Sequence, residues 1–134
     1  MTRVVDTSVV LAWYVVEQGS PAAVEYLATS LVAPGLMWLE LANALWKKVR
    51  RGEIDGLQAA IALDEATAAV TRIDERALAT RALEIGCELD HPVYDCVFLA
   101  SAEVMETRLV TADQRFAKVC RGSRYQAMLE VLGD

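Results

Sequence analysis

The strongest constraint on the fold is a repeated change in the spacing of apolar residues along the chain. Short apolar runs, typical of buried strands, lie at residues 3–6, 31–33, 70–73 and 108–111. The segments between them carry apolar residues at intervals of three and four, which is typical of helices. Strands separated by such helices predict βαβ crossovers. We therefore expect an α/β fold with three layers, α/β/α, around a central parallel sheet of four to five strands.

Local sequence signals set the expected ends of the helices. Thr7 or Ser8 is expected to cap the first helix and Asp55 the fourth, since both residue types accept hydrogen bonds from free helical N–H groups. Gly52 and Gly86 are expected to end two helices. The predicted helices span residues 9–16, 20–27, 36–51, 56–69, 75–85, 93–105 and 114–119, with a loop at 88–92 and a last strand or helix at 125–131.

Length and composition indicate one domain that needs no covalent or metal support. The 134 residues, of which 54% are hydrophobic, suffice for a single core. Cys87, Cys96 and Cys120 are odd in number and lie in apolar surroundings, so we expect reduced, buried thiols. His91, the only histidine, precedes Pro92 and is interpreted as a loop residue. Without a Cys/His ligand set, zinc is not expected.

The chain has no segment that resembles a membrane span or a signal peptide. Its longest stretch without a charge, residues 26–39, has 14 residues and contains Pro34 and Gly35. A spanning helix needs about 20 apolar residues. Asp6 interrupts the apolar N-terminal residues, which argues against a signal peptide. We expect a soluble protein in the cytoplasm.

Four acidic residues stand in apolar surroundings where solvated charges are unusual. Asp6 and Asp113 follow apolar runs at the ends of predicted strands. Glu40 and Asp95 lie inside apolar helical segments. Because functional groups of a parallel sheet gather at the carboxyl ends of its strands, Asp6 and Asp113 are expected to lie close together. Asp95, in the first turn of its helix, is expected to point over the same edge.

A carboxylate in such surroundings needs a cation, several hydrogen-bond donors or a proton. No lysine or arginine lies three or four residues from Glu40 or Asp95. Converging oxygen ligands select a hard cation, Mg²⁺ or Mn²⁺, and such a site suits phosphodiester hydrolysis. Simpler interpretations stay open: Asp6, Asp95 and Asp113 also fit helix capping, and Glu40 fits a solvated acid beside an apolar stripe.

The four acids and their neighbours, in this order, resemble the PIN-domain family, above all its VapC ribonuclease toxins. The matching segments are residues 4–8, 40–43, 94–100 and 109–113. The resemblance implies a single PIN domain over residues 1–134 that hydrolyses RNA with Mg²⁺ or Mn²⁺. It further implies that the ion is bound by Asp6, Glu40, Asp95 and Asp113, and that Thr7, Asn43 and Thr111 orient ligands or water.

The resemblance also implies partners: an RNA substrate, a VapB-like antitoxin and a second copy of the chain in a homodimer. The net charge of −6 argues mildly against a polyanionic partner, an argument that weakens if carboxylates bind metal. The apolar run at residues 36–45 and three tryptophans suggest a surface for a basic antitoxin tail, although tryptophans at helical spacing are more often part of the core. The tryptophans are Trp13, Trp38 and Trp46.

Other assignments remain open from the sequence. Basic residues at 47–51 fit either an RNA backbone or the dipole of the helix end, and the latter is favoured. Phe116 and Ala117 stand where some relatives carry a further acid, so the number of bound ions is open. A PIN nuclease of RNA processing or decay, without an antitoxin, is the alternative function. A phosphoacceptor domain is disfavoured because Asp6 lacks an adjacent acid.

Overall fold

A parallel sheet forms the centre of the computed structural model, which describes residues 1–15 and 20–133. Its strands lie in the order β3-β2-β1-β4-β5, and every pair of neighbours is parallel. The strands are β1 (Thr2–Val5), β2 (Ser30–Pro34), β3 (Val70–Ile73), β4 (Leu109–Thr111) and β5 (Leu129–Val131). The predicted α/β fold with four to five parallel strands is confirmed.

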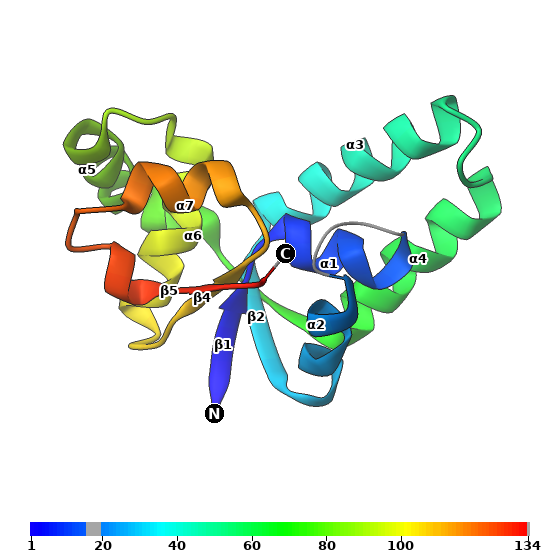
Figure 1. Ribbon diagram of the computed structural model, residues 1–134, viewed down its shortest axis with the longest axis horizontal. Helices are drawn as coiled ribbons and strands as arrows, with labels where there is room; N and C mark the ends of the chain where they lie inside the picture. Colours follow the sequence, from blue (N-terminus) through cyan, green and yellow to red (C-terminus); the bar gives the residue numbers. More distant parts are fainter. Residues whose placement is uncertain (16–19, 134) are drawn as a thin grey trace.

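Helices cover both faces of this sheet. Figure 1 shows the first four helices on one side of the strands and the last three on the other, which makes three layers. Right-handed crossovers produce this division, because the chain moves from β1 to β3 in one direction and later crosses to β4 and β5 in the other. The helices are α1 (Thr7–Tyr14), α2 (Ser20–Glu25), α3 (Leu36–Arg50), α4 (Gly56–Ala69), α5 (Ala79–Leu89), α6 (Val93–Val104) and α7 (Gln114–Cys120), with 3₁₀ turns η1 (Tyr26–Ala28), η2 (Glu75–Leu78) and η3 (Gln126–Met128).

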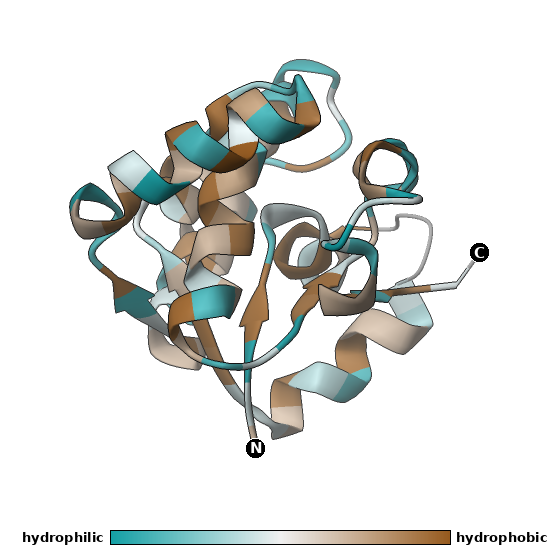
Figure 2. Ribbon diagram, turned by 90° about the vertical axis from the view of Figure 1, so that its left-hand side faces the viewer, coloured by the Kyte–Doolittle hydropathy of each residue, from teal (hydrophilic) through white to brown (hydrophobic). Residues whose placement is uncertain are grey.

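The core lies on both faces of the central strands. Val4 and Val5 of β1 and Val110 of β4 are fully buried, and Val4 is in register with Val32 of β2 and Leu109 of β4. Strands buried on both faces carry continuous apolar runs, which explains why the sequence pattern located them. Figure 2 shows the same distribution, with hydrophobic residues along the central strands.

The strand order creates a switch point between β1 and β4. The chain leaves β1 toward β2 on one side, whereas β4 lies against the other side of β1. Loops after two such strands diverge, and the crevice between them is where open α/β sheets bind ligands. Asp6 directly follows β1, and Asp113 follows β4 after one intervening residue.

The predicted helix end at Gly86 is wrong. Helix α5 continues to Leu89 and ends at Asp90, a residue with positive φ whose N–H donates to the carbonyl of Gly86. Glycine at position 86 serves close packing instead: a Cβ there would lie 2.9 Å from the carbonyl oxygen of His91. The predicted loop at 88–92 is accordingly shorter.

Three further predictions need correction or refinement. The cap of α1 is Asp6 and not Thr7 or Ser8, and its predicted end at residue 16 lies outside the described residues. The ambiguous segment at 125–131 forms η3 and then β5. Cys96 and Cys120 are buried as expected, but Cys87 is exposed. In the described ranges no helix is long and apolar enough to cross a membrane.

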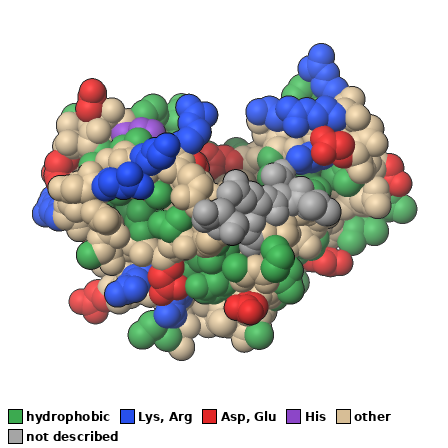
Figure 3. Space-filling view, in the orientation of Figure 1, with side chains coloured by type: hydrophobic (Ala, Val, Ile, Leu, Met, Phe, Trp, Pro, Cys, Tyr) green, Lys and Arg blue, Asp and Glu red, His purple; other side chains and the backbone are tan. Residues whose placement is uncertain are grey.

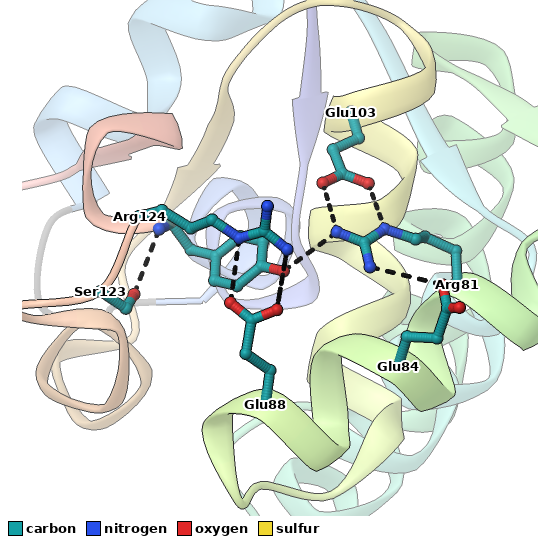
Figure 4. A network of polar contacts seen from close by, with 7 residues as sticks. Arg81, Glu84, Glu88, Glu103, Ser123 and Arg124 are labelled. Carbon is teal, nitrogen blue, oxygen red and sulfur yellow. Dashed lines mark hydrogen bonds and ion pairs between the residues drawn. The ribbon is translucent and has the colours of Figure 1, made fainter.

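A polar network fixes the C-terminal segment against α5 and α6 (Figure 4). Arg81 donates from Nε and Nη2 to the two carboxylate oxygens of Glu103, at 2.7 and 2.8 Å. Its Nη2 also lies 3.0 Å from the hydroxyl of Tyr125. Arg124 makes a second two-point contact, with Glu88, at 2.9 and 2.8 Å. Paired arginine–carboxylate contacts fix orientation as well as distance. Helices α5 and α6 are therefore held against the chain segment that follows α7.

Candidate active site

All four acids predicted from the sequence line one cavity of about 450 Å³, which we call the acidic pocket. It lies at the carboxyl edge of the sheet, where Figure 3 shows acidic side chains at the base of a notch and basic side chains on its rims. The acids come from four elements or their ends, so only the tertiary fold brings them together. The lining residues are Asp6, Thr7, Ser8, Leu11, Glu40, Asn43, Ala44, Lys47, Lys48, Arg51, Asp95, Phe98 and Asp113.

Asp6 is held by donors from both sides of the switch point. Its Oδ1 accepts from the backbone N–H of Ser8 at 3.0 Å, from the Ser8 hydroxyl, and from Val9 N–H at 3.3 Å. Its Oδ2 accepts from the hydroxyl of Thr111, at the end of β4. Asp6 is thus both a helix cap and a wall of the acidic pocket, and one role does not exclude the other.

Thr111 and Ser8 connect the two loops at this point. The Thr111 hydroxyl accepts from the backbone N–H of Asp113 at 3.0 Å, while the Ser8 hydroxyl accepts from Ala112 N–H at 2.9 Å. Asp113 caps α7, because its Oδ1 accepts from the N–H groups of two residues in that helix. The Thr111 hydroxyl therefore links the side chain of Asp6 to the backbone of Asp113, whose own side chain is held by the start of α7.

Glu40 and Asp95 belong to helices on opposite faces of the sheet. Glu40, in the second turn of α3, accepts a 2.6 Å hydrogen bond at Oε1 from the hydroxyl of Thr7, the first residue of α1. Asp95, in the first turn of α6, has its Oδ2 2.7 Å from Nε2 of His91. Both acids are partly buried. Asn43 lines the pocket one turn after Glu40 and is exposed.

The pocket disfavours negative charge on two of its acids. Burial raises the pKa of the Asp6 carboxyl to about 6, although the hydrogen bonds from Ser8 and Thr111 lower it. Repulsion from Asp113 also raises this pKa. Burial raises the pKa of Glu40 as well, and Asp95 adds repulsion while the Thr7 hydroxyl opposes the rise. Raised carboxylate pKa values in one cleft mark a candidate functional site.

A family model of the PIN domain matches residues 3–122. The chain belongs to the PIN-domain family. A curated relative, Ribonuclease VapC3 from Pyrobaculum aerophilum, is 31% identical over 123 residues, which are 88% of this chain and 94% of the relative. A crystal structure of a Pyrobaculum aerophilum protein gives a TM-score of 0.71 at 24% identity, covering 92% of this chain and 90% of the other. A toxin–antitoxin complex from Klebsiella pneumoniae also gives 0.71, at 16% identity and 98% coverage of each chain.

The donor set of this PIN domain fits a hard divalent cation. Its acidic pocket offers carboxylate oxygens, which Mg²⁺ and Mn²⁺ prefer, and burial together with repulsion disfavours negative charge on Asp6 and Glu40 in the absence of a cation. Among the described residues, 1–15 and 20–133, no lysine or arginine forms an ion pair with any of the four acids. Within the same ranges, no three His, Cys, Asp or Glu side chains are close enough to hold a metal ion as they stand.

Basic residues form one wall of the acidic pocket. Lys47, Lys48 and Arg51, at the end of α3, line the same cavity as the acids. The sequence favoured a purely helix-terminal role for them, and their place in the last turn of α3 does suit its dipole. The PIN fold adds what the sequence did not reveal, namely that this helix end faces the carboxylates.

The tryptophans do not form the continuous exposed surface predicted from the sequence. Trp13 and Trp38 are partly buried against the core, and Trp13 donates from Nε1 to the carbonyl of Ala23 at 2.8 Å. Trp46 is 52% exposed and stacks under the guanidinium of Arg50. The packing of α1 on α2 explains the difference for Trp13. The apolar pattern of each helix does not show that the two helices pack on each other.

Sequence reasoning missed two residues of this region, Ser8 and His91. Ser8 was considered only as a helix cap, yet its hydroxyl joins Asp6 to the loop after β4. His91 was interpreted as a loop residue and, although it lies four residues before Asp95, was not considered as a partner for that acid. The position of His91 four residues before Asp95, just ahead of the first turn of α6, was a usable signal.

Proposed function

We propose that this PIN domain is a divalent-metal-dependent endoribonuclease and the toxin of a toxin–antitoxin pair of the VapBC type. The observation that carries the proposal is the convergence of four carboxylates, from four elements, in one pocket at the switch point of the sheet. The name of the curated relative, Ribonuclease VapC3, supports the activity. We expect the protein to act in the cytoplasm, where RNA substrates are available.

Asp6, Glu40, Asp95 and Asp113 would hold Mg²⁺ or Mn²⁺, and they are the proposed catalytic residues. When bound, such an ion activates water, orients the phosphate and stabilises the leaving oxygen. The hydroxyls of Ser8 and Thr111 keep Asp6 in place, and that of Thr7 keeps Glu40 in place. Hydroxyl donors of this kind favour ionised carboxylates, the form that binds a cation. Asn43 is proposed to orient water or substrate at the mouth of the pocket.

RNA is the proposed substrate because basic residues lie beside the acidic centre, and a polyanion needs such residues to bind there. Lys47, Lys48 and Arg51 supply them on the wall formed by α3. Figure 3 shows basic side chains on both rims of the notch, so a strand that enters it meets positive charge before it reaches the acids. Phosphate contacts of this type provide affinity without sequence selection. The overall charge of −6 therefore does not argue against RNA.

The proposed partner is a VapB-like antitoxin with a basic tail. The toxin–antitoxin complex among the similar structures supports this class of partner. The arm formed by α3 and α4, which projects from the sheet in Figure 1, exposes Trp46, Leu57 and Ile61 by 52%, 70% and 48%. Exposed apolar side chains beside an acidic pocket suit a segment that is apolar along part of its length and basic at its end.

A homodimer is proposed through a second apolar surface, on α3, α5 and α6. Leu39, Leu83 and Tyr94 are 72%, 57% and 64% exposed there. A shallow apolar hollow beside them is lined by Leu36, Ala79, Ala82, Val93, Tyr94 and Val97, together with Glu75. Large exposed apolar residues around a hollow are typical of protein interfaces. Light scattering that finds a monomer at micromolar concentration would contradict this part of the proposal.

The alternative function is a PIN nuclease of RNA processing or decay that has no antitoxin. It uses the same pocket and the same residues, so only the partner separates the two. Co-expression with the product of the neighbouring gene should relieve growth arrest if the chain is a toxin. Growth that the chain does not impair, or arrest that no neighbouring product relieves, favours the alternative.

The test of the nuclease proposal is cleavage of a single-stranded RNA by purified protein with Mn²⁺. Asp113→Asn should reduce the rate at least about 100-fold, because it removes a charge from the pocket while keeping the helix cap. Asp64→Asn, on the exposed surface of α4, is the matched control and should cleave normally. Equal rates for the two variants would refute the assignment of the acidic pocket as the active site.

A further inference from the structure

His91 contacts one acid of the acidic pocket but does not line the pocket, and the proposed mechanism does not use it. Its Nε2 lies 2.7 Å from Asp95 Oδ2, and its side chain is 21% exposed. The imidazole lines a separate hollow, bordered by Leu83 and Pro92, and is not among the residues that line the acidic pocket. It therefore contacts Asp95 without lining the acidic pocket itself.

Two contacts besides that with Asp95 fix the position of His91, one through its backbone and one through its ring. The backbone N–H of His91 donates to the carbonyl of Gly86 in α5 at 3.0 Å, and the close approach there leaves no room for a side chain on residue 86. The ring packs on Phe116 of α7, with centroids 5.3 Å apart. Phe116 is buried, and its own N–H holds the Asp113 carboxylate at 3.1 Å. One ring thus connects the supports of two pocket acids.

We propose that His91 is a positioning residue for the acidic pocket, which holds one oxygen of Asp95 so that the carboxylate stays directed into the pocket. This inference rests on the proposed function. An ionised carboxylate only accepts hydrogen bonds, so Nε2 carries the proton and donates it. Side chains that hold a metal-binding carboxylate from behind affect metal affinity by about 10-fold to 100-fold.

The simpler role, support of the first turn of α6, makes a different prediction. His91 and Asp95 are four residues apart at the start of this helix, so their contact also stabilises the fold. A purely structural contact would change the unfolding midpoint and leave the affinity for metal unchanged. A positioning contact changes the affinity even where the midpoint in chelator is close to that of the unsubstituted protein.

The experiment measures Mn²⁺ affinity by calorimetry, without RNA, for the full chain and two variants. His91→Phe keeps the ring on Phe116 and removes the donor, so the affinity should fall at least about tenfold. His91→Gln supplies an amide donor at a similar reach and should stay within about threefold. If His91→Phe does not fold, His91→Leu takes its place.

Two results would overturn the positioning role: an unchanged Mn²⁺ affinity in His91→Phe, or equal losses in His91→Phe and His91→Gln. Cleavage of RNA by the unsubstituted protein is scored separately. Its absence would refute the nuclease proposal, whereas an unchanged affinity in His91→Phe refutes the positioning role alone. Unfolding midpoints in chelator identify any loss that comes from a destabilised fold.

Discussion

The burial of Asp6 makes the stability of the metal-free protein depend on pH. The pKa of Asp6 is about 6 in the folded protein, against an ordinary value of 3.8. Because the folded state binds this proton more tightly than the unfolded chain, Asp6 stabilises the fold fully below about pH 4. That stabilisation is lost as the pH rises through about 6. The difference in pKa corresponds to about 3 kcal/mol in total, of which about 1.4 kcal/mol is lost between pH 5 and pH 8.

Asp6→Asn removes this titration and nearly preserves the size of the side chain. We expect the free energy of unfolding of the unsubstituted protein, minus that of Asp6→Asn, to fall by about 1.4 kcal/mol between pH 5 and pH 8. Urea denaturation in the presence of a chelator measures the free energy of unfolding of both proteins at each pH. In thermal unfolding the same change is roughly 5 °C in the midpoint for a domain of this size.

The comparison isolates Asp6 because Glu40, whose pKa burial also raises, is present in both proteins. Asp64→Asn, an exposed substitution on α4, should give a flat difference over the same range. A flat or rising difference for Asp6→Asn would refute the reasoning, because it would mean that the folded state does not disfavour the ionised carboxylate.

Three other predictions follow from the pocket and the polar network. Mn²⁺ should raise the unfolding midpoint of the unsubstituted protein by mass action and should do so much less in Asp113→Asn, and equal increases would contradict binding in the acidic pocket. Lys47→Gln and Arg51→Gln should each weaken RNA binding in a filter assay and reduce its salt dependence, whereas unchanged salt slopes would exclude phosphate contacts. Arg81→Met should lower the free energy of unfolding by about 2 kcal/mol in urea titration, because Glu103 loses its partner, and a change below about 0.5 kcal/mol would show that the network contributes little.

The sequence predicted the centre of the sheet well because its central strands are apolar on both faces. Runs such as residues 31–33 carry that signal without knowledge of the rest of the chain, and β2 includes those residues. The cap at Asp55 was predicted for the same reason, since it depends only on neighbouring residues and includes a reciprocal bond with Gln58. Local patterns suffice wherever the structure depends on local contacts.

The errors arose where a residue serves a contact distant in sequence. Gly86 was expected to end a helix, but it allows α5 to approach the chain at His91. Trp13 fitted either a partner surface or the core from the sequence, and its packing beside α2 decides for the core. Cys87 was expected to be buried because its neighbours are apolar, yet it lies on the solvent side of α5. Periodicity indicates that a helix has two faces but not which neighbour covers each face.

The sequence predicted the four acids of the candidate site and, through the family resemblance, Thr7 and Thr111 beside them, but not the other supporting residues. Asp6 and Glu40 stood out because a carboxylate among apolar residues needs compensation. The structure brings these acids into one pocket, and their role in metal binding stays a prediction. The contact of Ser8 and the place of Lys47 beside the acids could not be predicted, because the first depends on a neighbour from another element and the second on the direction of a helix end.

The most direct test of the central claim follows the oxygen atom that water contributes to the product. RNA is cleaved with Mn²⁺ in ¹⁸O-labelled water, and the terminal phosphates of the fragments are analysed by mass spectrometry. The account predicts one labelled oxygen on each new terminal phosphate, in an amount that Asp95→Asn reduces at least about 100-fold. Fragments that end in an unlabelled 2′,3′-cyclic phosphate, formed equally by Asp95→Asn, would contradict it, because the attacking group would then be the ribose hydroxyl and the acidic pocket would not be required.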